Sequence, residues 1–505
     1  MKNKGIIVLF LLISVVCIPF LIFLSACGDS TNGGGENGNP ANDNAAENVS
    51  GGVTEETKPP HEMPEKDYNG YNFKFLVKEF DGNGYWGAVD IFAEAENGDP
   101  INDSVYKRNR IIEERYNIDI SEIRGGSHDD ISNKAKNSIL SGTHEYDIIM
   151  PNLTSISNLA TTGLLMDARS TMPYIQFDKI WWDQRANKML TLGNRQYFLV
   201  GDMTLMANDA TWVIMFNKKV AEEYGLGNLY SYVKDDNWNF DTFGMLVKTV
   251  SKDLNGDGKF DENDQVGLLT TCGEASPIMV YNTGEMVARK NADDLPYLSL
   301  NTERTINAAQ KSFDILSDKT TCVQTEYLAK INDPWTNGIN KMFQENKGLF
   351  YMLSLTIMHK MRVMDSDFGV LPFPKLDKSQ NEYYHTIQAS VANSIVFPLT
   401  TPDPEMASII IEDMCYESRD TVRHAYFDIT ITNKTIRDEE SAEMLNLIFN
   451  TRIYDLGYIF NWGGLGTMIA TIYPDAGKFV SKYEAAEPRA QIAMEKTLNE
   501  IVGID

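Results

Sequence analysis

Two hydrophobic periods alternate along residues 68–505. Short runs in which apolar and polar residues alternate, or which are wholly apolar, predict β-strands. These strands are expected at residues 71–77, 117–120, 146–150, 212–216, 265–270, 368–372 and 394–398. Between them lie segments with one apolar face, which predict helices. Strands that alternate with helices indicate a mostly parallel sheet covered by helices, so we predict an α/β fold.

Several helices have recognisable first residues. Asn102-Asp103-Ser104 precedes a segment with apolar residues on one face, so we expect the helix to start there. Asp241 is expected to cap a helix over 242–252, and Pro404 to open an amphipathic helix that reaches Tyr416. The last hundred residues have a mainly helical pattern.

The first 26 residues have the pattern of a targeting segment. Lys2 and Lys4 precede an apolar run from Ile6 to Leu24, and Leu24-Ser25-Ala26-Cys27 follows. A basic start, an apolar stretch and small residues before a cut indicate a secretory signal. Small residues directly before a cysteine resemble the bacterial lipobox, which implies lipidation of Cys27. A single membrane-spanning helix is the alternative, because the apolar run is nearly long enough.

Residues 27–67 are predicted to be a flexible tether after the lipidated cysteine. The tract is rich in Gly, Asn, Glu, Pro and Ser and almost lacks large apolar residues. Such a chain buries too little surface to offset the entropy lost on ordering. The predicted location is therefore the extracytoplasmic face of the bacterial cell membrane, with the folded body held by a lipid anchor.

Length and charge narrow the function of the body. Its length exceeds what one core usually holds, so we expect two lobes. The formal net charge is −26, from 45 basic and 71 acidic residues. The sequence contains no basic footprint of the kind that nucleic acid requires, so we expect no nucleic-acid partner. After Cys27 the remaining cysteines of the body, Cys272, Cys322 and Cys415, allow at most one disulfide.

The body resembles the family 1 extracellular solute-binding proteins, the lipoprotein receptors of bacterial sugar importers. The resemblance rests on segments that span most of residues 70–500. They are Ser104–Arg110 with Tyr116-Asn117-Ile118, Tyr146–Met150, Phe216–Lys219 with Leu229-Tyr230 and Trp238–Asp241, and Phe368–Asp377 with Tyr383-Tyr384.

The resemblance implies a periplasmic-binding-protein-like type II fold, in which two lobes close about a hinge over one solute in an interlobe cleft. It implies a carbohydrate ligand, a membrane permease of an ABC transporter as partner, and a monomer. The ATPase would be a separate chain, since no P-loop motif occurs. On this pattern lobe 1 holds 68–208 and about 388–440, and lobe 2 holds about 209–387 and 441–505.

The stretch DLNGDGKFDEND, residues 253–264, has the spacing of a twelve-residue calcium loop. Calcium prefers six to eight oxygen ligands, and Gly258 stands where such a loop turns sharply. The predicted ligands are Asp253, Asn255, Asp257, the carbonyl of Lys259, Asp261 and Asp264. An Asn-Gly and Asp-Gly turn without a metal is the alternative. The predicted role of calcium is structural.

Aromatic and polar residues in loops are the candidate ligand contacts. Sugar receptors stack aromatic rings on sugar faces and place polar side chains at the hydroxyl edges. The candidates are Trp86, Asn152, Asp209, Trp212, Trp335 and Trp462. Trp86 and Trp462 are preferred for stacking because glycines flank both and permit close approach. Trp181 and Trp182 are adjacent further candidates. For every tryptophan, core packing is the alternative.

The sequence is also compatible with other functions. A cell-surface glycosidase would use two carboxylates, but acidic residues are so abundant here that pairs carry no signal, and neither His-Glu-x-x-His nor Gly-x-Ser-x-Gly occurs. We therefore expect no enzymatic activity. A receptor for a peptide or another polar solute, a sensor subunit and an adhesin are the further alternatives.

Overall fold

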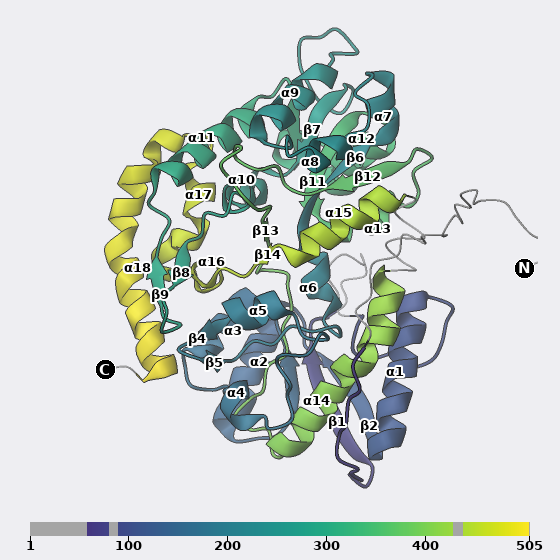
Figure 1. Ribbon diagram of the computed structural model, residues 1–505, viewed down its shortest axis with the longest axis vertical. Coiled ribbons are helices and arrows are strands. Elements are labelled where there is room, and N and C mark those ends of the chain that lie inside the picture. Colours follow the sequence, from purple (N-terminus) through teal and green to yellow (C-terminus); the bar gives the residue numbers. More distant parts are fainter. Residues whose placement is uncertain (1–57, 80–88, 428–437, 504–505) are drawn as a thin grey trace, which may run out of the picture. The chain divides into compact units, whose positions relative to one another are not determined.

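The computed structural model describes residues 58–79, 89–427 and 438–503, shown in colour in Figure 1. The signal segment, Cys27 and Trp86 lie outside the described residues, so the expectations for them stay predictions. Within the described part of the chain, no helix combines the length and the apolar character needed to cross a membrane.

The first sheet lies in the lower part of Figure 1 and has the strand order β2-β1-β3. All pairs are parallel, with Phe73 opposite Ile120 and Phe75 opposite Ile148. The predicted strand 394–398 makes isolated bridges rather than a regular ladder: Val396 pairs with Ile149, and Ile395 with Leu199. The helices α1, α2, α3 and α14 pack around this sheet.

The second sheet lies in the upper part of Figure 1 and has the order β10-β7-β11-β6-β12. Strands β10, β7 and β11 are parallel, while β6 runs antiparallel to both β11 and β12. Every residue of β6, β7, β11 and β12 is buried, which explains why these strands are apolar runs instead of alternating patterns.

The strands are β1 Tyr71–Val77, β2 Ile118–Arg124, β3 Ile148–Met150, β4 Thr191–Leu192, β5 Arg195–Gln196, β6 Trp212–Asn217, β7 Val266–Thr270, β8 Ala288–Lys290, β9 Pro296–Leu298, β10 Cys322–Gln324, β11 Gly348–Ser354, β12 Phe368–Leu371, β13 His385–Thr386 and β14 Arg452–Ile453. The main helices are α1 Pro100–Tyr116, α2 His128–Ser141, α3 Leu153–Ala160, α5 Gln184–Met189, α6 Leu205–Asp209, α7 Lys218–Glu223, α8 Tyr230–Lys234, α9 Phe240–Val250, α10 Cys272–Tyr281, α11 Glu303–Ser317, α12 Lys341–Gln344, α13 Met358–Met361, α14 Pro404–Ser418, α15 Glu439–Asn450, α16 Leu456–Phe460, α17 Met468–Ile472 and α18 Phe479–Val502. Short helices include α4 Ala168–Thr171, η1 Thr325–Leu328, η2 Pro334–Asn340, η3 Leu355–Ile357, η4 Arg419–Arg423, η6 Trp462–Thr467 and η7 Ala476–Lys478.

Two helices start earlier than their sequences suggest. Asp99 caps α1, because its side chain accepts hydrogen bonds from the backbone nitrogens of Ile101 and Asn102. Asn239 likewise caps α9 in place of the predicted Asp241. Both caps have extended backbone, which lets the side-chain oxygen reach the next free N–H groups. Where several capping residues adjoin, the sequence alone does not identify the one with this conformation.

Three short segments lie side by side at the junction between the two sheets. Thr211 pairs with Ile387, and His385 and Thr386 of β13 pair with Arg452 and Ile453 of β14. We name residues 208–211, which include the end of α6, 385–388 and 452–454 the junction strands. They lie between the two sheets, in the middle of Figure 1, where β13 and β14 are labelled.

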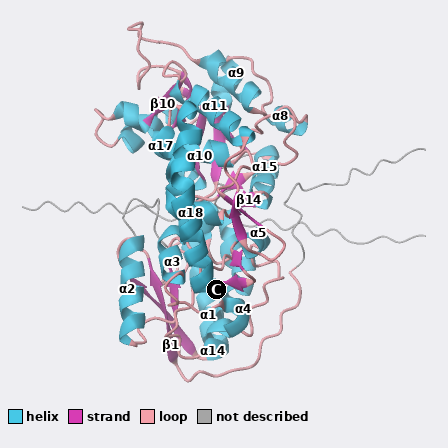
Figure 2. Cartoon of the chain, turned by 90° about the vertical axis from the view of Figure 1, so that its left-hand side faces the viewer, coloured by secondary structure: helices cyan, strands magenta, loops and turns pink. Residues whose placement is uncertain are grey.

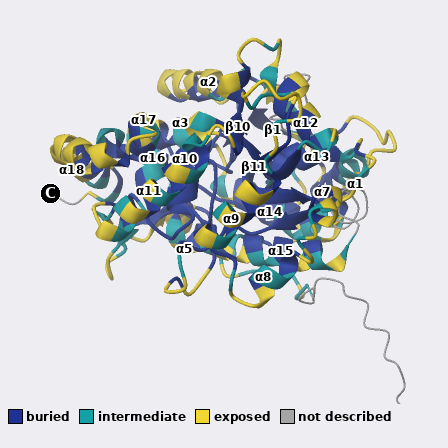
Figure 3. Cartoon of the chain, turned by 90° about the horizontal axis from the view of Figure 1, so that it is seen from above, coloured by how far each residue is buried: buried dark blue, intermediate teal, exposed yellow. Residues whose placement is uncertain are grey.

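The C-terminal helix α18 connects distant parts of the described chain, and Figure 2 shows it running along the side that faces the viewer. Near its end, the carbonyl of Ile501 accepts a hydrogen bond from Arg195, 2.7 Å away. A Cβ at Gly193 would lie 2.7 Å from Val502, so the β4–β5 turn needs glycine for this close approach. The outer faces of α18 and α2 are exposed (Figure 3).

Residues 58–67 correct the predicted extent of the tether. The sequence places them outside the fold, but the structure packs this segment, here named the strap, along α14. Lys58 pairs with Asp420 at 2.8 Å and Lys66 with Glu405 at 2.7 Å. Between these ends, the His61 ring stacks on Tyr416 with centroids 4.4 Å apart.

The length of the strap matches the helix that it follows. The fifteen positions from Glu405 to Asp420 span roughly 22 Å at helical rise, and the eight from Lys58 to Lys66 reach about 26 Å when extended. The partners lie more than 300 residues away in the sequence, as for Lys58 and Asp420. A local, polar and proline-containing composition therefore could not reveal them.

A buried carboxylate organises the core beside the strap. Glu412 of α14 accepts hydrogen bonds from the indole nitrogens of Trp181 at 2.9 Å and Trp182 at 2.8 Å, and from the backbone of Gln176 at 3.0 Å. Burial raises the pKa of Glu412 to about 7, although these donors oppose the shift. Both tryptophans are therefore core residues, as the alternative interpretation held.

Replacing Glu412 by Gln is expected to flatten the dependence of stability on pH. The pKa of Glu412 is about 7 in the folded protein against an ordinary 4.5, so the native state binds more protons between these values. The free energy of unfolding of the wild type, relative to Glu412→Gln, should therefore fall by about 1–3 kcal/mol as pH rises from 5 to 7. Urea titrations at four pH values measure this difference, and parallel curves for the two proteins would contradict it.

The packing of the strap predicts an unusual titration of His61. Burial lowers the pKa of this ring, which the charge of Asp413 only partly opposes. Changing Tyr416 to Ala removes the stacking surface and should return the pKa to about 6.5. Glu405→Gln is the matched control, since its ion pair is exposed and weak. NMR titration with His61→Ala for assignment tests this; an ordinary His61 pKa in the wild type would show that the strap is not docked.

Candidate functional site

Ligands of open α/β sheets bind beyond the carboxyl ends of the strands. In the first sheet β3 ends at Met150, and in the second β7 ends at Thr270 and β10 at Gln324. A helix follows each of these ends within two residues: α3, α10 and η1. Free backbone N–H groups at helix starts and polar loop residues thus gather at these edges.

Asn152 is the polar residue at the end of β3. Asn152 caps α3, because its side-chain oxygen accepts a hydrogen bond from the backbone nitrogen of Ser155. Its side-chain amide nitrogen donates to the carbonyl of Ser390. Its backbone nitrogen donates to Nδ1 of His128, 3.1 Å away, and burial lowers the pKa of that ring to about 4. Asn152 therefore lies at the predicted edge of the sheet, and its side chain is buried and caps α3.

Two carboxylates lie at the corresponding edge of the second sheet. Glu326 of η1 accepts hydrogen bonds from the backbone nitrogens of Cys272 at 2.9 Å and Gly273 at 3.4 Å, at the first turn of α10. Burial alone would raise the pKa of Glu326, but these and other donors outweigh it and lower the pKa. Glu326 is therefore held in its charged form.

Glu274 follows two residues after Cys272, and its environment is different. Its side chain is exposed, yet protein atoms crowd the carboxyl group enough for desolvation to raise its pKa, and the charge of Glu326 adds to the rise. Gln388 of the junction strands donates a hydrogen bond to Glu274 at 2.8 Å and accepts one from the indole of Trp212 at 3.1 Å. Glu274 is thus connected directly to the junction strands.

Exposed aromatic rings lie close to these carboxylates in the chain. Tyr327 of η1 and Trp335 of η2 are each 37% exposed, although most aromatic side chains of the described residues are buried. The two short helices pack against each other beyond the end of β10. An exposed ring offers an apolar face, so the predicted Trp335 keeps the property that stacking on a sugar requires.

Asp209, another predicted contact, is the last residue of α6. Its carboxylate accepts a hydrogen bond from the hydroxyl of Tyr426 at 2.6 Å, and the His359 ring lies 3.6 Å away. Its backbone carbonyl accepts from Thr356 at 3.2 Å. Asp209 therefore lies where segments that follow α14 and β11 meet.

Trp212 and Trp462, predicted to contact a ligand, are packed in the core. Trp212 is the first residue of β6 and is wholly buried, like the apolar residues that follow it. Trp462 stacks on Phe460 at 5.3 Å and donates to Thr497 at 2.9 Å. The adjacent Gly463 is needed for packing, because a Cβ there would lie 2.5 Å from Ala490 of α18. Neither indole offers a free face in this structure.

Glu274, Glu326 and Tyr327 were missed by the sequence analysis. Cys272 to Glu274 follow an expected strand end, so the rule about carboxyl ends of strands could have identified Glu274. Glu326 and Tyr327 follow β10, a three-residue strand that the hydrophobic pattern did not indicate.

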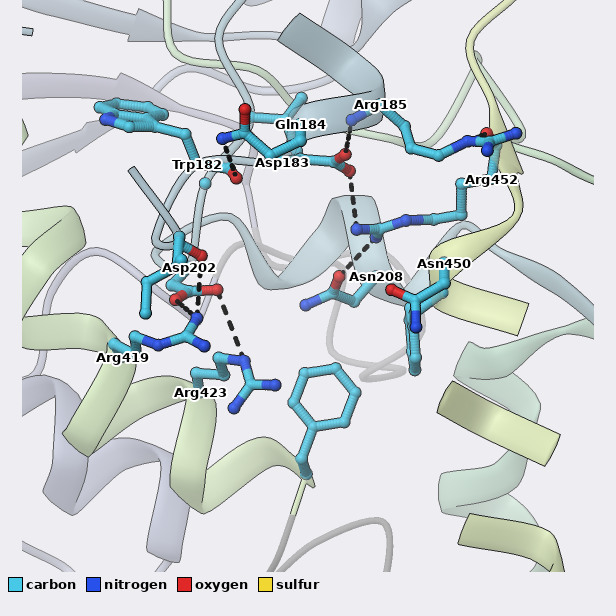
Figure 4. Close-up of a pocket in the computed structure, with 15 residues that line it drawn as sticks. Trp182, Asp183, Gln184, Arg185, Asp202, Asn208, Arg419, Arg423, Asn450 and Arg452 are labelled. Atoms are coloured by element: carbon cyan, nitrogen blue, oxygen red, sulfur yellow. Dashed lines mark hydrogen bonds and ion pairs between the residues drawn. The ribbon is translucent and has the colours of Figure 1, made fainter. Parts of the chain in front are cut away.

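A polar cavity of about 280 Å³ lies on the junction strands beside α5 and the end of α14 (Figure 4). Its lining includes Asp183, Asp202 and four arginines, namely Arg185, Arg419, Arg423 and Arg452. None of these residues belongs to the predicted ligand contacts. The charged lining distinguishes this cavity from the edge that carries Trp335 and Glu326.

The loop 253–264 has tight turns held by its own side chains. Asp253 accepts hydrogen bonds from the backbone of Gly256 and Gly258, both with positive φ, and Asp264 accepts from Leu254 and Asp261. Among the described residues, no group of three or more His, Cys, Asp or Glu side chains is placed to hold a metal ion. The turn geometry suits the spacing, whereas gathered carboxylates are not observed, so calcium binding stays a prediction.

No protein-family model and no curated protein sequence matches the chain. Solved structures do match. The lacto-N-biose-binding protein of an ABC transporter from Bifidobacterium longum aligns with 86% of this chain and 99% of its own, at 14% identity and a TM-score of 0.54. An ABC substrate-binding protein from Listeria monocytogenes, in complex with cycloalternan, aligns with 86% and 100% at 11% identity and a TM-score of 0.52.

A third match is UgpB from Mycobacterium tuberculosis in complex with glycerophosphocholine, with 85% of this chain and 99% of that one aligned, 14% identity and a TM-score of 0.52. At these identities the likeness concerns the fold. The predicted fold class is confirmed: the chain has the two-lobe α/β fold of ABC-transporter solute-binding proteins.

Proposed function

We propose that this protein captures an oligosaccharide between its two lobes and delivers it to the permease of an ABC transporter. The observation that carries the proposal is the edge of the second sheet. There, exposed Tyr327 lies near the carboxylate of Glu326, whose charge in turn acts on Glu274. Trp335 is exposed on η2, which packs against η1, at the strand ends where α/β folds bind ligands. Ring faces and hydroxyl acceptors together are what a sugar requires.

The structural neighbours support a carbohydrate over a peptide. Among the proteins of similar structure, three have cycloalternan, maltotetraose or lacto-N-biose bound, and one has glycerophosphocholine bound. The two exposed rings favour a ligand with more than one sugar unit, since each ring can cover one sugar face. Binding rather than catalysis is proposed, and incubation of the purified protein with the bound oligosaccharide should leave that sugar intact.

The proposal includes the membrane anchor inferred from the sequence. Lipidation of Cys27 would hold the body at the extracytoplasmic face, where the permease lies, and the protein would act as a monomer. The strap gives the tether a defined end, because it joins the body along α14. We also propose that the loop 253–264 binds calcium with Asp253, Asn255, Asp257, Lys259, Asp261 and Asp264 as ligands.

Replacing Trp335 by Ala is expected to weaken oligosaccharide binding about tenfold or more, a loss of about 1.4 kcal/mol or greater. The ring is exposed in the free protein, so its removal should leave the melting temperature nearly unchanged. Calorimetric titration with the tightest binder among lacto-N-biose, maltotetraose and cycloalternan measures the effect. Tyr297→Ala, which removes an exposed ring from β9, is the control. Equal affinity of wild type and Trp335→Ala would exclude this ring from the site.

Calcium is expected to raise the melting temperature, and a chelator should reverse the rise. Asp257→Asn keeps the oxygen that accepts a hydrogen bond from Lys259 while removing one charge. The calcium-dependent rise should therefore shrink in this variant, whereas its melting temperature in chelator should equal that of the wild type. Identical melting curves of the wild type with calcium and with chelator would contradict the proposed metal site.

A further inference from the structure

The first turn of α10 binds a carboxylate of the protein itself. One oxygen of Glu326 accepts the backbone N–H of Cys272 at 2.9 Å, and the other accepts that of Gly273 at 3.4 Å. The hydroxyls of Thr271 at 3.1 Å and Thr325 at 2.9 Å donate to the same carboxylate. Free N–H groups at the start of a helix attract phosphates and carboxylates. In α10 this attraction is satisfied internally, without a solute.

The negative charge at this edge of the second sheet is not neutralised by a nearby cation. Uncharged donors alone hold the Glu326 carboxylate, and Gln388 is the partner of Glu274. Neither glutamate forms an ion pair with a described residue. The ammonium group of Lys319 lies 4.8 Å from the ring centroid of Tyr327, so this cation contacts a ring rather than a carboxylate.

The field of Glu326 acts on the groups around it. Burial raises the pKa of Cys272, Glu274 and Tyr327, and the charge of Glu326 adds to each of these rises. An ionised group on a solute beside the same residues would be subject to the same field. The field therefore extends from the helix start to the exposed ring of Tyr327, where a sugar would stack.

The accessible groups at this edge suit hydroxyls and oppose anions. Glu274, Glu326 and Tyr327 are all exposed. A sugar hydroxyl can donate a hydrogen bond to a carboxylate oxygen, whereas an ionised acid group cannot donate and is repelled by the like charge. Unpaired charges placed against the wrong ligand are a general way of obtaining specificity.

We propose that Glu326 is a specificity-determining residue of the oligosaccharide site, which makes this edge accept uncharged sugar units and reject units that carry carboxylate, sulfate or phosphate groups. Glu326 occupies the place at the start of α10 where an acidic group of a solute would otherwise bind. Glu274 adds a second carboxylate and strengthens the discrimination. This inference rests on the proposed function, and it narrows the ligand to a neutral oligosaccharide.

The test compares a neutral sugar with its own acidic derivative. Maltotetraose, lacto-N-biose and cycloalternan are titrated by calorimetry into the whole chain without residues 1–26, each beside a derivative whose primary hydroxyls are oxidised to carboxylates. The neutral sugar that binds most tightly and its derivative are then used throughout. In the wild type the Kd of the acidic derivative should exceed that of the neutral sugar by about tenfold or more. Higher ionic strength should reduce this ratio, because salt screens charges near the surface.

Three variants assign the discrimination to particular carboxylates. Glu326→Gln and Glu274→Gln each remove one charge at the site and keep a side-chain oxygen as acceptor. Glu114→Gln is the matched control, since it removes the same charge from an exposed residue of α1. The ratio of the two Kd values should fall about fivefold or more in Glu326→Gln and about twofold or more in Glu274→Gln, and it should not change in Glu114→Gln.

Melting curves without sugar show whether each variant is folded. If Glu326→Gln is destabilised because α10 loses its anion, the exposed Glu274→Gln decides the assignment. Equal Kd values of the wild type for the neutral sugar and its acidic derivative, or tighter binding of the derivative, would overturn the inference and leave the oligosaccharide receptor standing. An unchanged ratio in both site variants would also overturn it. Binding of none of the six compounds would overturn the proposed function and this inference together.

Discussion

The pairing of the three junction strands is the constraint on which the two-lobe arrangement depends. Gln388 donates its backbone N–H to the carbonyl of Ala210 at 3.0 Å, and Ile387 donates to Ile453 at 3.1 Å. These bonds lie between backbone groups of segments far apart in the sequence. They hold together the places where the chain passes between its sheets.

The side chains of the junction strands contact polar groups in other elements. Gln388 reaches Glu274 at the start of α10, Asp209 meets Tyr426 and His359, and Arg452 reaches Asp183. A two-lobe receptor can only move by adjusting backbone angles in such crossing segments, as hinge motions in general do. Glu274, a proposed solute contact, is therefore hydrogen-bonded to a residue of the segments that would move.

The sequence predicted the fold class well because its signals are local and strong. Buried strands such as β6 and β11 are continuous apolar runs, and the resemblance to solute-binding proteins covers most of the body. The site was harder to predict. Trp335 keeps its exposed ring, but Trp462 does not, because its neighbouring glycine serves the approach of α18 rather than that of a ligand. The sequence Trp-Gly is the same whether the glycine makes room for a helix or for a ligand.

Long-range partners explain the remaining differences. The strap looks like tether until Asp420, Asp413 and Glu405 are brought alongside it, and Glu326 gains its role only when β10 is placed beside β7. The groups that line the cavity also come from distant segments: Arg419 lies 217 residues from Asp202, with which it pairs. No periodicity or motif records such meetings, because they arise from tertiary packing.

The central claim is that the protein binds an oligosaccharide, and the most direct measurement is thermal unfolding of residues 58–505 against a panel of oligosaccharides, monosaccharides and peptides. A ligand present at about a hundred times its dissociation constant stabilises the native state by about 2.7 kcal/mol, which such melting curves resolve. The account predicts that at least one oligosaccharide raises the melting temperature while the peptides do not. A rise with peptides alone, or with no member of the panel, would contradict it.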